Sequence, residues 1–410
     1  SSLRPASVHP SARRWRAAVS VAGTSADGAA ALTDIVSAVD DRTPQGIAAT
    51  VSRLVGTGLL RTGDRLPTVR ELAAALGTSP TTVSAAWQAL GARGVIESRG
   101  RLGSFVLARP RSTQRYSRMS GEQPRNFRLD LATGTPDPTL LPDLGPALLR
   151  IGRRAHVSNY HEEHVVPQLK DRVLATWPYA PESLAVVDGA LYALDRLTTS
   201  AVGFGDRVLV ENPTFPAMLD LLDQRGAQTV PVVTDDQGPV PESVAEGLLA
   251  QPVAFFLQPR AQNPSGASLT ARRVRELARV LRGSGVLVIE DDHAGDIATT
   301  PDLSLGALLP EQTVHIRSYS KSHGPDLRIA VVAGSAALID PLTRRRHLGS
   351  GWSSRLLQNL LVELLDDPAA QDTVSRARHA YEHRRQALRS ALAERGATSS
   401  AGSGVNLWVE

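Results

Sequence analysis

The 410-residue chain contains no cysteine, so neither a disulfide framework nor a cysteine-ligated metal site can form. This absence is typical of a reducing compartment, and we expect a cytoplasmic protein. No long apolar run is free of charged residues, which argues against a membrane-spanning helix. The arginines near the N-terminus are scattered and precede no clean apolar stretch, so this part does not read as a secretory signal.

Acidic residues are scarce in one stretch of a nearly neutral chain. The formal net charge is only +4, yet the span from Arg93 to Arg118 holds seven arginines and a single acid, Glu97. Such a block indicates either a polyanionic partner or a solvated basic linker. Charge alone does not separate the two interpretations.

Residues 43–108 carry the pattern of three helices followed by a hairpin. Thr43-Pro44 predicts a capped helix start, Gly77 ends a second amphipathic helix, and Gly94 ends a third. Two short strands then flank the basic turn RGRLG. This order predicts a winged helix-turn-helix that binds a double-stranded DNA operator. Residues 1–42 before it form an expected N-terminal extension, partly disordered, with a short helix over 28–40.

Several polar side chains of this module are placed to contact DNA. The N-terminal part of the third helix would enter the major groove, and Arg99 and Arg101 flank a glycine in the wing. Arg70 opposes the dipole at its helix start, which favours a phosphate or guanine partner, although it could pair with Asp64 instead. The candidate DNA-binding residues are Thr68, Arg70, Ser79, Thr81, Thr82, Arg99 and Arg101. The threonines could equally be ordinary helix caps.

Together, the segment GDRLPTVRELAAALGTSPTTVSAAWQALGARGVIESRGRLGSFV resembles the GntR-type winged helix-turn-helix. The resemblance covers about 65 residues and implies a transcription regulator.

Beyond a polar, basic linker predicted at 109–128, the pattern changes to strands alternating with helices over 129–410. Near-continuous apolar runs are typical of strands buried on both faces of a mainly parallel sheet with helices on either side. The predicted strands are 184–189, 207–212, 229–233, 253–258, 286–291, 313–318 and 329–334.

Polar residues at the ends of these strands fit a pyridoxal phosphate site. Lys321 is of the type that forms a Schiff base with the cofactor aldehyde, and lysines are few in this chain. Arg328 and Ser318 could hold a phosphate, and Asp291 could pair with a protonated pyridine nitrogen. The remaining candidates are Asn263 for the ring oxygen, Gly189 and Ala190 at a helix start, and Phe215 and Tyr160 as ring or phosphate contacts. A surface lysine, an acidic loop, an ordinary NPSG turn and core aromatics are the structural alternatives.

The ordered set resembles the fold-type I aminotransferases, and with the N-terminal module the chain is similar to the MocR-type branch of the GntR regulators. The resemblance implies Lys321 as the Schiff-base residue, Asp291 as the pyridine partner, Asn263 as the ring-oxygen donor, and Arg328 and Ser318 as phosphate ligands. It also implies a head-to-tail homodimer, with Tyr160 reaching the partner's phosphate.

The sequence departs from the family pattern in a few places. His293 and Phe215 stand where tyrosines are usual, and the charge of His293 would depend on pH. The ending SGVNLWVE suggests that the small C-terminal subdomain is incomplete, without the arginine that grips a substrate carboxylate.

Three functions remain open at this point. We expect first a regulator that senses pyridoxal phosphate, an amine or an amino acid and is catalytically silent. A regulator whose body has lost the cofactor and only dimerises or binds another molecule is the second. The third is an active aminotransferase. No metal site is expected.

Overall fold

The computed structural model describes residues 28–92, 94–107, 115–116, 134–154, 159, 162–203, 205–349 and 351–409. The chain divides into two compact units, Ser1–Arg109 and Pro110–Glu410. Tyr160 and most of the predicted linker lie outside the described residues.

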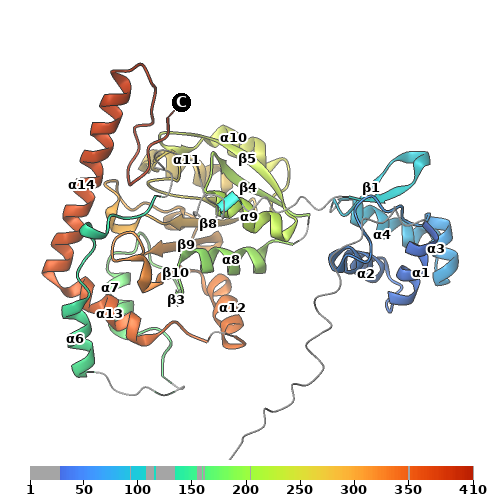
Figure 1. Ribbon diagram of the computed structural model, residues 1–410, viewed down its shortest axis with the longest axis horizontal. Coiled ribbons are helices and arrows are strands. Elements are labelled where there is room, and N and C mark those ends of the chain that lie inside the picture. Colours follow the sequence, from blue (N-terminus) through green and yellow to red (C-terminus); the bar gives the residue numbers. More distant parts are fainter. Residues whose placement is uncertain are drawn as a thin grey trace, which may run out of the picture. The chain divides into compact units, whose positions relative to one another are not determined.

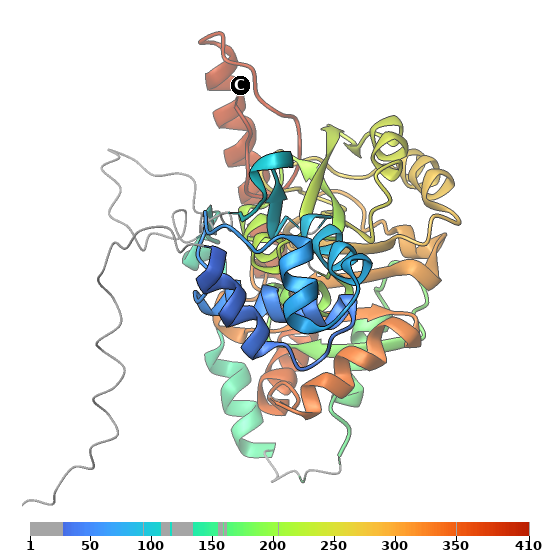
Figure 2. The ribbon, with the colours of Figure 1, turned by 90° about the vertical axis from the view of Figure 1, so that its right-hand side faces the viewer.

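The first unit contains the predicted helices and hairpin (Figures 1 and 2). The hairpin strands pair in antiparallel register, with Glu97 opposite Phe105. A further bridge joins Arg65 to Phe105. The elements are α1 (Gly28–Ala38), α2 (Pro44–Thr57), α3 (Val69–Leu76), α4 (Pro80–Ala92), β1 (Ile96–Ser98), the 3-10 turn Gly100–Leu102 and β2 (Ser104–Val106).

Local signals set the helix ends as the sequence predicts. Thr43 accepts a hydrogen bond from the backbone N–H of Gly46, with Pro44 at the first helical position. Gly77 ends α3 at φ 65°, a conformation that glycine adopts without a Cβ penalty. The apolar faces of α3 and α4 are buried. Helix α1 contacts both α2 and α3, so the unit gains a helix from the stretch that we assigned to the N-terminal extension.

The second unit is built on one eight-stranded sheet, which confirms the predicted mainly parallel α/β fold (Figure 1). Within the described sheet, β10 and the short β6 run against the direction of the other strands; β10 pairs with β3 and β9, and β6 pairs with β5. In sheet order the strands are β3 (Ser183–Val187), β10 (Ala330–Gly334), β9 (Thr313–Ser318), β8 (Leu287–Asp292), β7 (Ala254–Leu257), β4 (Arg207–Asn212), β5 (Gln228–Asp235) and β6 (Gly238–Pro239).

Both faces of this sheet are covered, which explains the continuous apolar runs. Successive residues of a strand point to opposite faces. In β4, Val208 and Val210 join one buried cluster with α8 (Ala190–Ala201), α9 (Pro216–Arg225) and α12 (Ala336–His347). Leu209 packs on the other face with α10 (Pro241–Leu248) and α11 (Ala271–Leu281).

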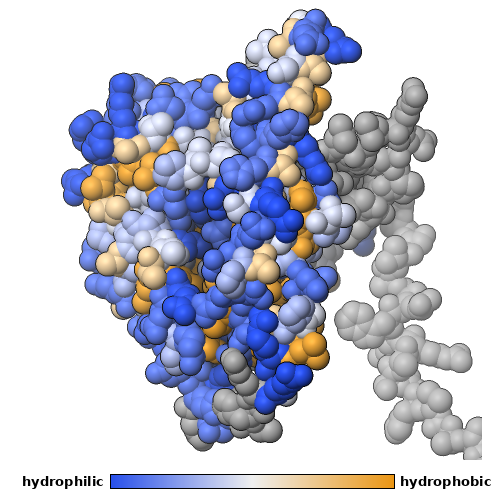
Figure 3. Space-filling model, turned by 90° about the vertical axis from the view of Figure 1, so that its left-hand side faces the viewer, coloured by the Kyte–Doolittle hydropathy of each residue, from blue (hydrophilic) through white to orange (hydrophobic). Residues whose placement is uncertain are grey.

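A third buried cluster joins β3 and β10 to α6 (Gly145–Arg154), α7 (Pro167–Leu174) and α13 (Arg355–Asp366). The long α14 (Pro368–Ala393) follows, and after it a bridge joins Ser399 to Val409. The face that carries α6 and α14 is mostly hydrophilic, with scattered hydrophobic atoms (Figure 3). Among the described residues, no helix combines the length and apolarity that crossing a membrane requires.

Candidate functional site

The sheet topology brings the predicted cofactor residues to one edge. Strands β3, β4, β7, β8 and β9 share a direction, so their carboxyl ends meet, and the antiparallel β10 begins there. Ligands of open α/β sheets bind at this edge. The residues that follow or end these strands are Gly189, Phe215, Asn263, Asp291 and Lys321, with Arg328 just before β10.

Lys321 lies partly buried in the turn after β9. Its Nζ donates a hydrogen bond to the carbonyl oxygen of Gly134 at 2.8 Å. Burial lowers the pKa of Lys321 to about 8, and the nearby Asp291 carboxylate offsets part of that shift. At neutral pH a larger fraction of the Lys321 amine is therefore unprotonated and nucleophilic than in an exposed lysine.

Asp291 is buried, and only one of its carboxylate oxygens has a hydrogen-bond partner among the described residues. Its Oδ2 accepts a hydrogen bond from Nε2 of Gln258 at 2.8 Å, whereas its Oδ1 has no partner among the described residues. Burial raises the pKa of Asp291 to about 6, and the Gln258 hydrogen bond opposes that rise. Because an unpaired buried carboxylate oxygen is costly, this atom marks a place for a hydrogen-bond donor.

A pocket opens beside Asp291, and Phe215 is one of its walls. Glu211 also lines it, and burial raises the pKa of that carboxyl to about 8. The other lining residues are Leu194, Thr214, Met218, Phe256, Leu257 and Gln258. A flat apolar ring with one donor nitrogen matches this combination of apolar walls and a carboxylate.

Arg328 and the turn before α8 form an anion cradle. The Arg328 Nη2 donates to the carbonyl oxygen of Asp188 at 3.1 Å, and the residue forms no ion pair among the described residues. Gly189 has φ 100°, and a Cβ there would lie 3.1 Å from the guanidinium. Ala190 begins α8, and the first backbone N–H groups of a helix have no carbonyl partner within it, so this turn can bind an anion. A cation beside a helix N-terminus suits a phosphate.

The other predicted cofactor residues lie at the same sheet edge with local partners. Ser318, the buried last residue of β9, places its Oγ 3.3 Å from both the Oγ and the backbone nitrogen of Ser320. The backbone N–H of Asn263 donates to Oε1 of Gln258 at 2.7 Å. His293 Nε2 lies 2.9 Å from the carbonyl oxygen of Ala261, to which it donates.

The chemistry of His293 differs from the sequence interpretation. Burial lowers its pKa to about 3, so the ring stays neutral near neutral pH, where we expected a pH-dependent charge. Since Nε2 carries the proton in the bond to Ala261, the other ring nitrogen is an acceptor. In this arrangement His293 does not replace the hydroxyl donor of a tyrosine.

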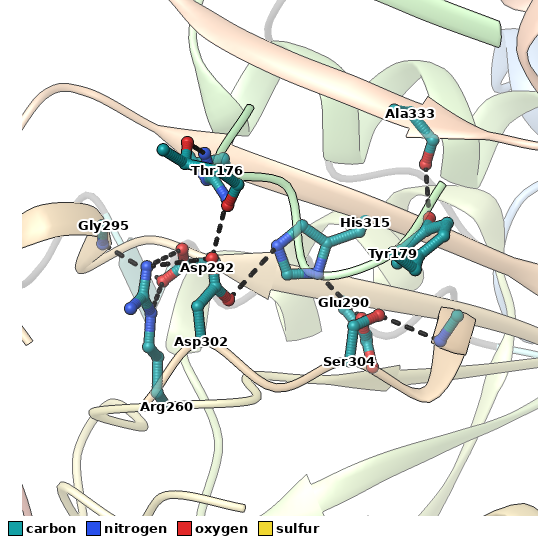
Figure 4. A network of polar contacts seen from close by, with 12 residues as sticks. Thr176, Tyr179, Arg260, Glu290, Asp292, Gly295, Asp302, Ser304, His315 and Ala333 are labelled. Carbon is teal, nitrogen blue, oxygen red and sulfur yellow. Dashed lines mark hydrogen bonds and ion pairs between the residues drawn. The ribbon is translucent and has the colours of Figure 1, made fainter. Parts of the chain in front are cut away.

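A buried charged network around β8 and β9 was not predicted (Figure 4). Arg260 binds both oxygens of Asp292 at 2.9 and 2.7 Å and holds the pKa of that carboxyl at about 2. Arg317 binds Asp302 at 2.7 Å, and His315 contacts Glu290 at 2.8 Å.

The network shows which of two adjacent acids is available to a ligand. Asp292 is ion-paired with Arg260, whereas Asp291 lines the pocket. Asp292, Asp302 and His315 converge as metal ligands could, but arginines already neutralise both carboxylates. Gln258 and Glu211 were also missed, although each stands at the end of a buried strand, which was the available signal.

The DNA-binding candidates lie on one module. Arg70 is exposed in the first turn of α3 and makes no ion pair within the described residues; Asp64 is buried and accepts the backbone N–H of Arg61 instead. Thr68 caps α3 reciprocally with Glu71. Ser79 Oγ lies 2.8 Å from the hydroxyls of both Thr81 and Thr82 at the start of α4.

The wing residues are less free than predicted. Arg99 binds Glu97 at 2.8 Å and lies over the Phe105 ring, with about half of its side chain exposed. The backbone of Arg101 lies in the 3-10 turn of the wing, and its side chain is outside the described part of the structure.

These two units define a class of protein: a transcription regulator with a helix-turn-helix module and an aminotransferase-like body. Residues 43–106 match the bacterial regulatory proteins of the gntR family, and residues 128–409 match aminotransferase class I and II. The chain belongs to the GntR-family regulators with an aminotransferase class I and II domain, the MocR-type architecture that the sequence predicted.

Known relatives share nearly the whole length. The chain is 36% identical over 377 residues to the vitamin B6 salvage pathway transcriptional repressor PtsJ of Salmonella typhimurium, covering 90% of this chain and 86% of that one. It is 25% identical to the pyridoxine biosynthesis transcriptional regulator PdxR of Corynebacterium glutamicum, covering 86% and 79%.

Solved structures support the fold of the second unit. The α-aminoadipate aminotransferase LysN of Thermus thermophilus superposes with a TM-score of 0.62 at 24% identity, covering 68% of this chain and 76% of that one. The Pyrococcus horikoshii kynurenine aminotransferase gives 0.63 at 22%, covering 68% and 74%. At these identities the likeness shows the fold alone.

Proposed function

We propose that this regulator binds pyridoxal 5'-phosphate at the sheet edge around Lys321 and that this ligand, or an amine or amino acid that reacts with it, alters operator binding. The observation that carries the proposal is the unpartnered Oδ1 of Asp291, buried beside an apolar pocket. The names of PtsJ and PdxR, both tied to vitamin B6, point to the same chemistry.

The residues present fit the cofactor. Asp291 would hold the protonated pyridine nitrogen at its free oxygen, and Phe215 would pack on the ring from the pocket wall. Arg328, Ser318 and the N-terminus of α8, at Gly189 and Ala190, would hold the phosphate. Asn263 would donate to the ring oxygen. When bound, the cofactor supplies an aldehyde that condenses with an amine and releases water.

Lys321 is the amine of this chain suited to that attachment. Its lowered pKa leaves about a tenth of the amine unprotonated at pH 7, against less than about a thousandth for an ordinary lysine. The hydrogen bond to the Gly134 carbonyl oxygen fixes the position of Nζ.

We assign DNA binding to the first unit. We place the start of α4, with Ser79, Thr81 and Thr82, in the major groove, and Arg70, Thr68 and the wing residues Arg99 and Arg101 near the phosphates. By the family resemblance we also propose a homodimer, which would present two modules to two half-sites. Light scattering of the purified full chain tests the dimer.

The deciding experiment is an absorption spectrum of the full chain mixed with pyridoxal 5'-phosphate. The chain holds two lysines, and the exposed Lys170 supplies the control. We expect a new visible band in the wild type and in Lys170→Arg, but not in Lys321→Ala. Borohydride reduction and peptide mapping should place the added mass on Lys321. A wild type without a band would favour an aminotransferase-like body that senses another molecule.

A further inference from the structure

Two residues of the predicted linker dock on the second unit beside the pocket. Arg115 and Tyr116 form the short cyan piece beside α9 in Figure 1. They contact Asp220 and Asp223, which lie three residues apart and hence on one face of α9.

Asp220 binds the backbone of this segment. Its Oδ1 accepts the N–H of Arg115 at 3.1 Å, and its Oδ2 accepts the N–H of Tyr116 at 2.8 Å. Asp220 is only 8% exposed, so its carboxylate is desolvated and depends on these donors. Because the donors are backbone N–H groups, these hydrogen bonds fix the main chain of the segment and not only a side chain.

Side chains of the same segment extend the contact in two directions. The Arg115 guanidinium lies 2.5 Å from Oδ2 of Asp223 and 3.3 Å from Oδ1 of Asp220. The Tyr116 ring meets Phe215 edge to face, with ring centroids 5.5 Å apart. Phe215 and Asp291 both line the pocket, so the linker reaches a residue of the candidate cofactor site.

We propose that Arg115–Tyr116 is a docking segment, which fixes one point of the linker to α9 and couples it, through Tyr116 and Phe215, to occupancy of the pocket. The coupling rests on the proposed function; the docking does not. A ring packed on Phe215 immobilises the surface that Tyr116 contacts, so ligand binding strengthens docking. Docking at Arg115 fixes a point that lies six residues along the sequence from Arg109, the last residue of the DNA-binding unit.

Limited trypsin digestion of the full chain tests the docking, because Arg111, Arg115 and Arg118 are all cleavage sites in one linker. We expect cleavage after Arg115 to be at least tenfold slower than after the other two. Asp223→Asn and Asp220→Asn should remove most of that protection. The control Asp195→Asn, which breaks an unrelated Arg–Asp pair on α8, should leave it unchanged. Equal cleavage after all three arginines in the wild type would overturn the docking.

The coupling is tested by repeating the digestion with pyridoxal 5'-phosphate. We expect several-fold further protection of Arg115 in the wild type and none in Lys321→Ala. Arg115→Gln should keep the absorption band within twofold but lose most of the cofactor-induced change in operator Kd, unlike Arg111→Gln. A wild type without a band would overturn the proposed function and the coupling, while slow cleavage at Arg115 would still support docking. A normal band with unaltered protection would overturn the coupling alone.

Discussion

Gln258 donates a hydrogen bond from its side-chain amide to one oxygen of Asp291, and the other, buried oxygen has no partner in the described part of the chain. The Gln258 Oε1 accepts the backbone N–H of Asn263, and this bond orients the amide. Gln258 therefore positions the acid that we assign to the pyridine nitrogen and links it to the residue assigned to the ring oxygen. Gln258 also lines the pocket beside Asp291.

Gln258→Leu should weaken pyridoxal phosphate binding by about 10- to 100-fold, the range for losing a hydrogen bond to a charged group. The substitution removes the bond that lowers the Asp291 pKa, so this pKa should rise above about 6 and the loss should deepen as pH falls. Absorbance titration at pH 6.5 and 8 measures both effects. The exposed Gln228→Leu is the control; equal affinities in the two variants would contradict the role of Gln258.

Gly189→Ala should weaken cofactor binding by tenfold or more. At φ 100° and ψ 162°, a region essentially limited to glycine, a Cβ is strained by about 1–3 kcal/mol, and here it also presses on the Arg328 guanidinium. Gly283→Ala is a matched control, because Gly283 has φ 75° and open space around its Cα. Both variants should lose similar stability in urea unfolding. Only Gly189→Ala should lose affinity for pyridoxal 5'-phosphate. A comparable loss in both variants would contradict the assignment of the phosphate to the turn at Gly189.

Cofactor capture should depend on pH through Lys321. Because burial lowers the pKa of Lys321 to about 8, the reactive unprotonated amine accumulates as pH rises toward 8. The second-order rate constant, followed by stopped-flow absorbance, should rise about tenfold per unit below pH 8 and level off above it. A rise that continues to pH 10 would instead indicate an ordinary exposed amine, with Lys170→Arg as the control.

Arg70→Ala should weaken operator binding about tenfold and leave the absorption band unchanged. Arg70 is exposed in the first turn of α3, where a cation opposes the helix dipole and gains nothing locally. If Arg70 contacts a phosphate, the slope of log Kd against log salt should fall by about one. Anisotropy titrations at several salt concentrations check this. Arg272→Ala, on the second unit, should alter neither quantity.

Much of this architecture could be predicted from local pattern. Helix ends depend on backbone geometry within a few residues, so the roles of Thr43, Gly77 and Gly189 can be predicted from the sequence. The strands of the large sheet are nearly continuous apolar runs because both of their faces are buried. Since parallel strands end at one edge, the order of Asn263, Asp291 and Lys321 along the chain was enough to place them together.

The sequence by itself determined the order of the elements, the two units and the residue types at the strand ends, because these depend on periodicity and on local turns. Only the tertiary structure decided that Asp291 and not Asp292 lines the pocket, since Asp292 is ion-paired with Arg260, a residue 32 positions away. It also decided the neutrality of His293 and the lowered pKa of Lys321, because burial, which no local pattern encodes, sets both. The docking of Arg115 on Asp220 joins residues 105 positions apart, and only the packed chain brings them together.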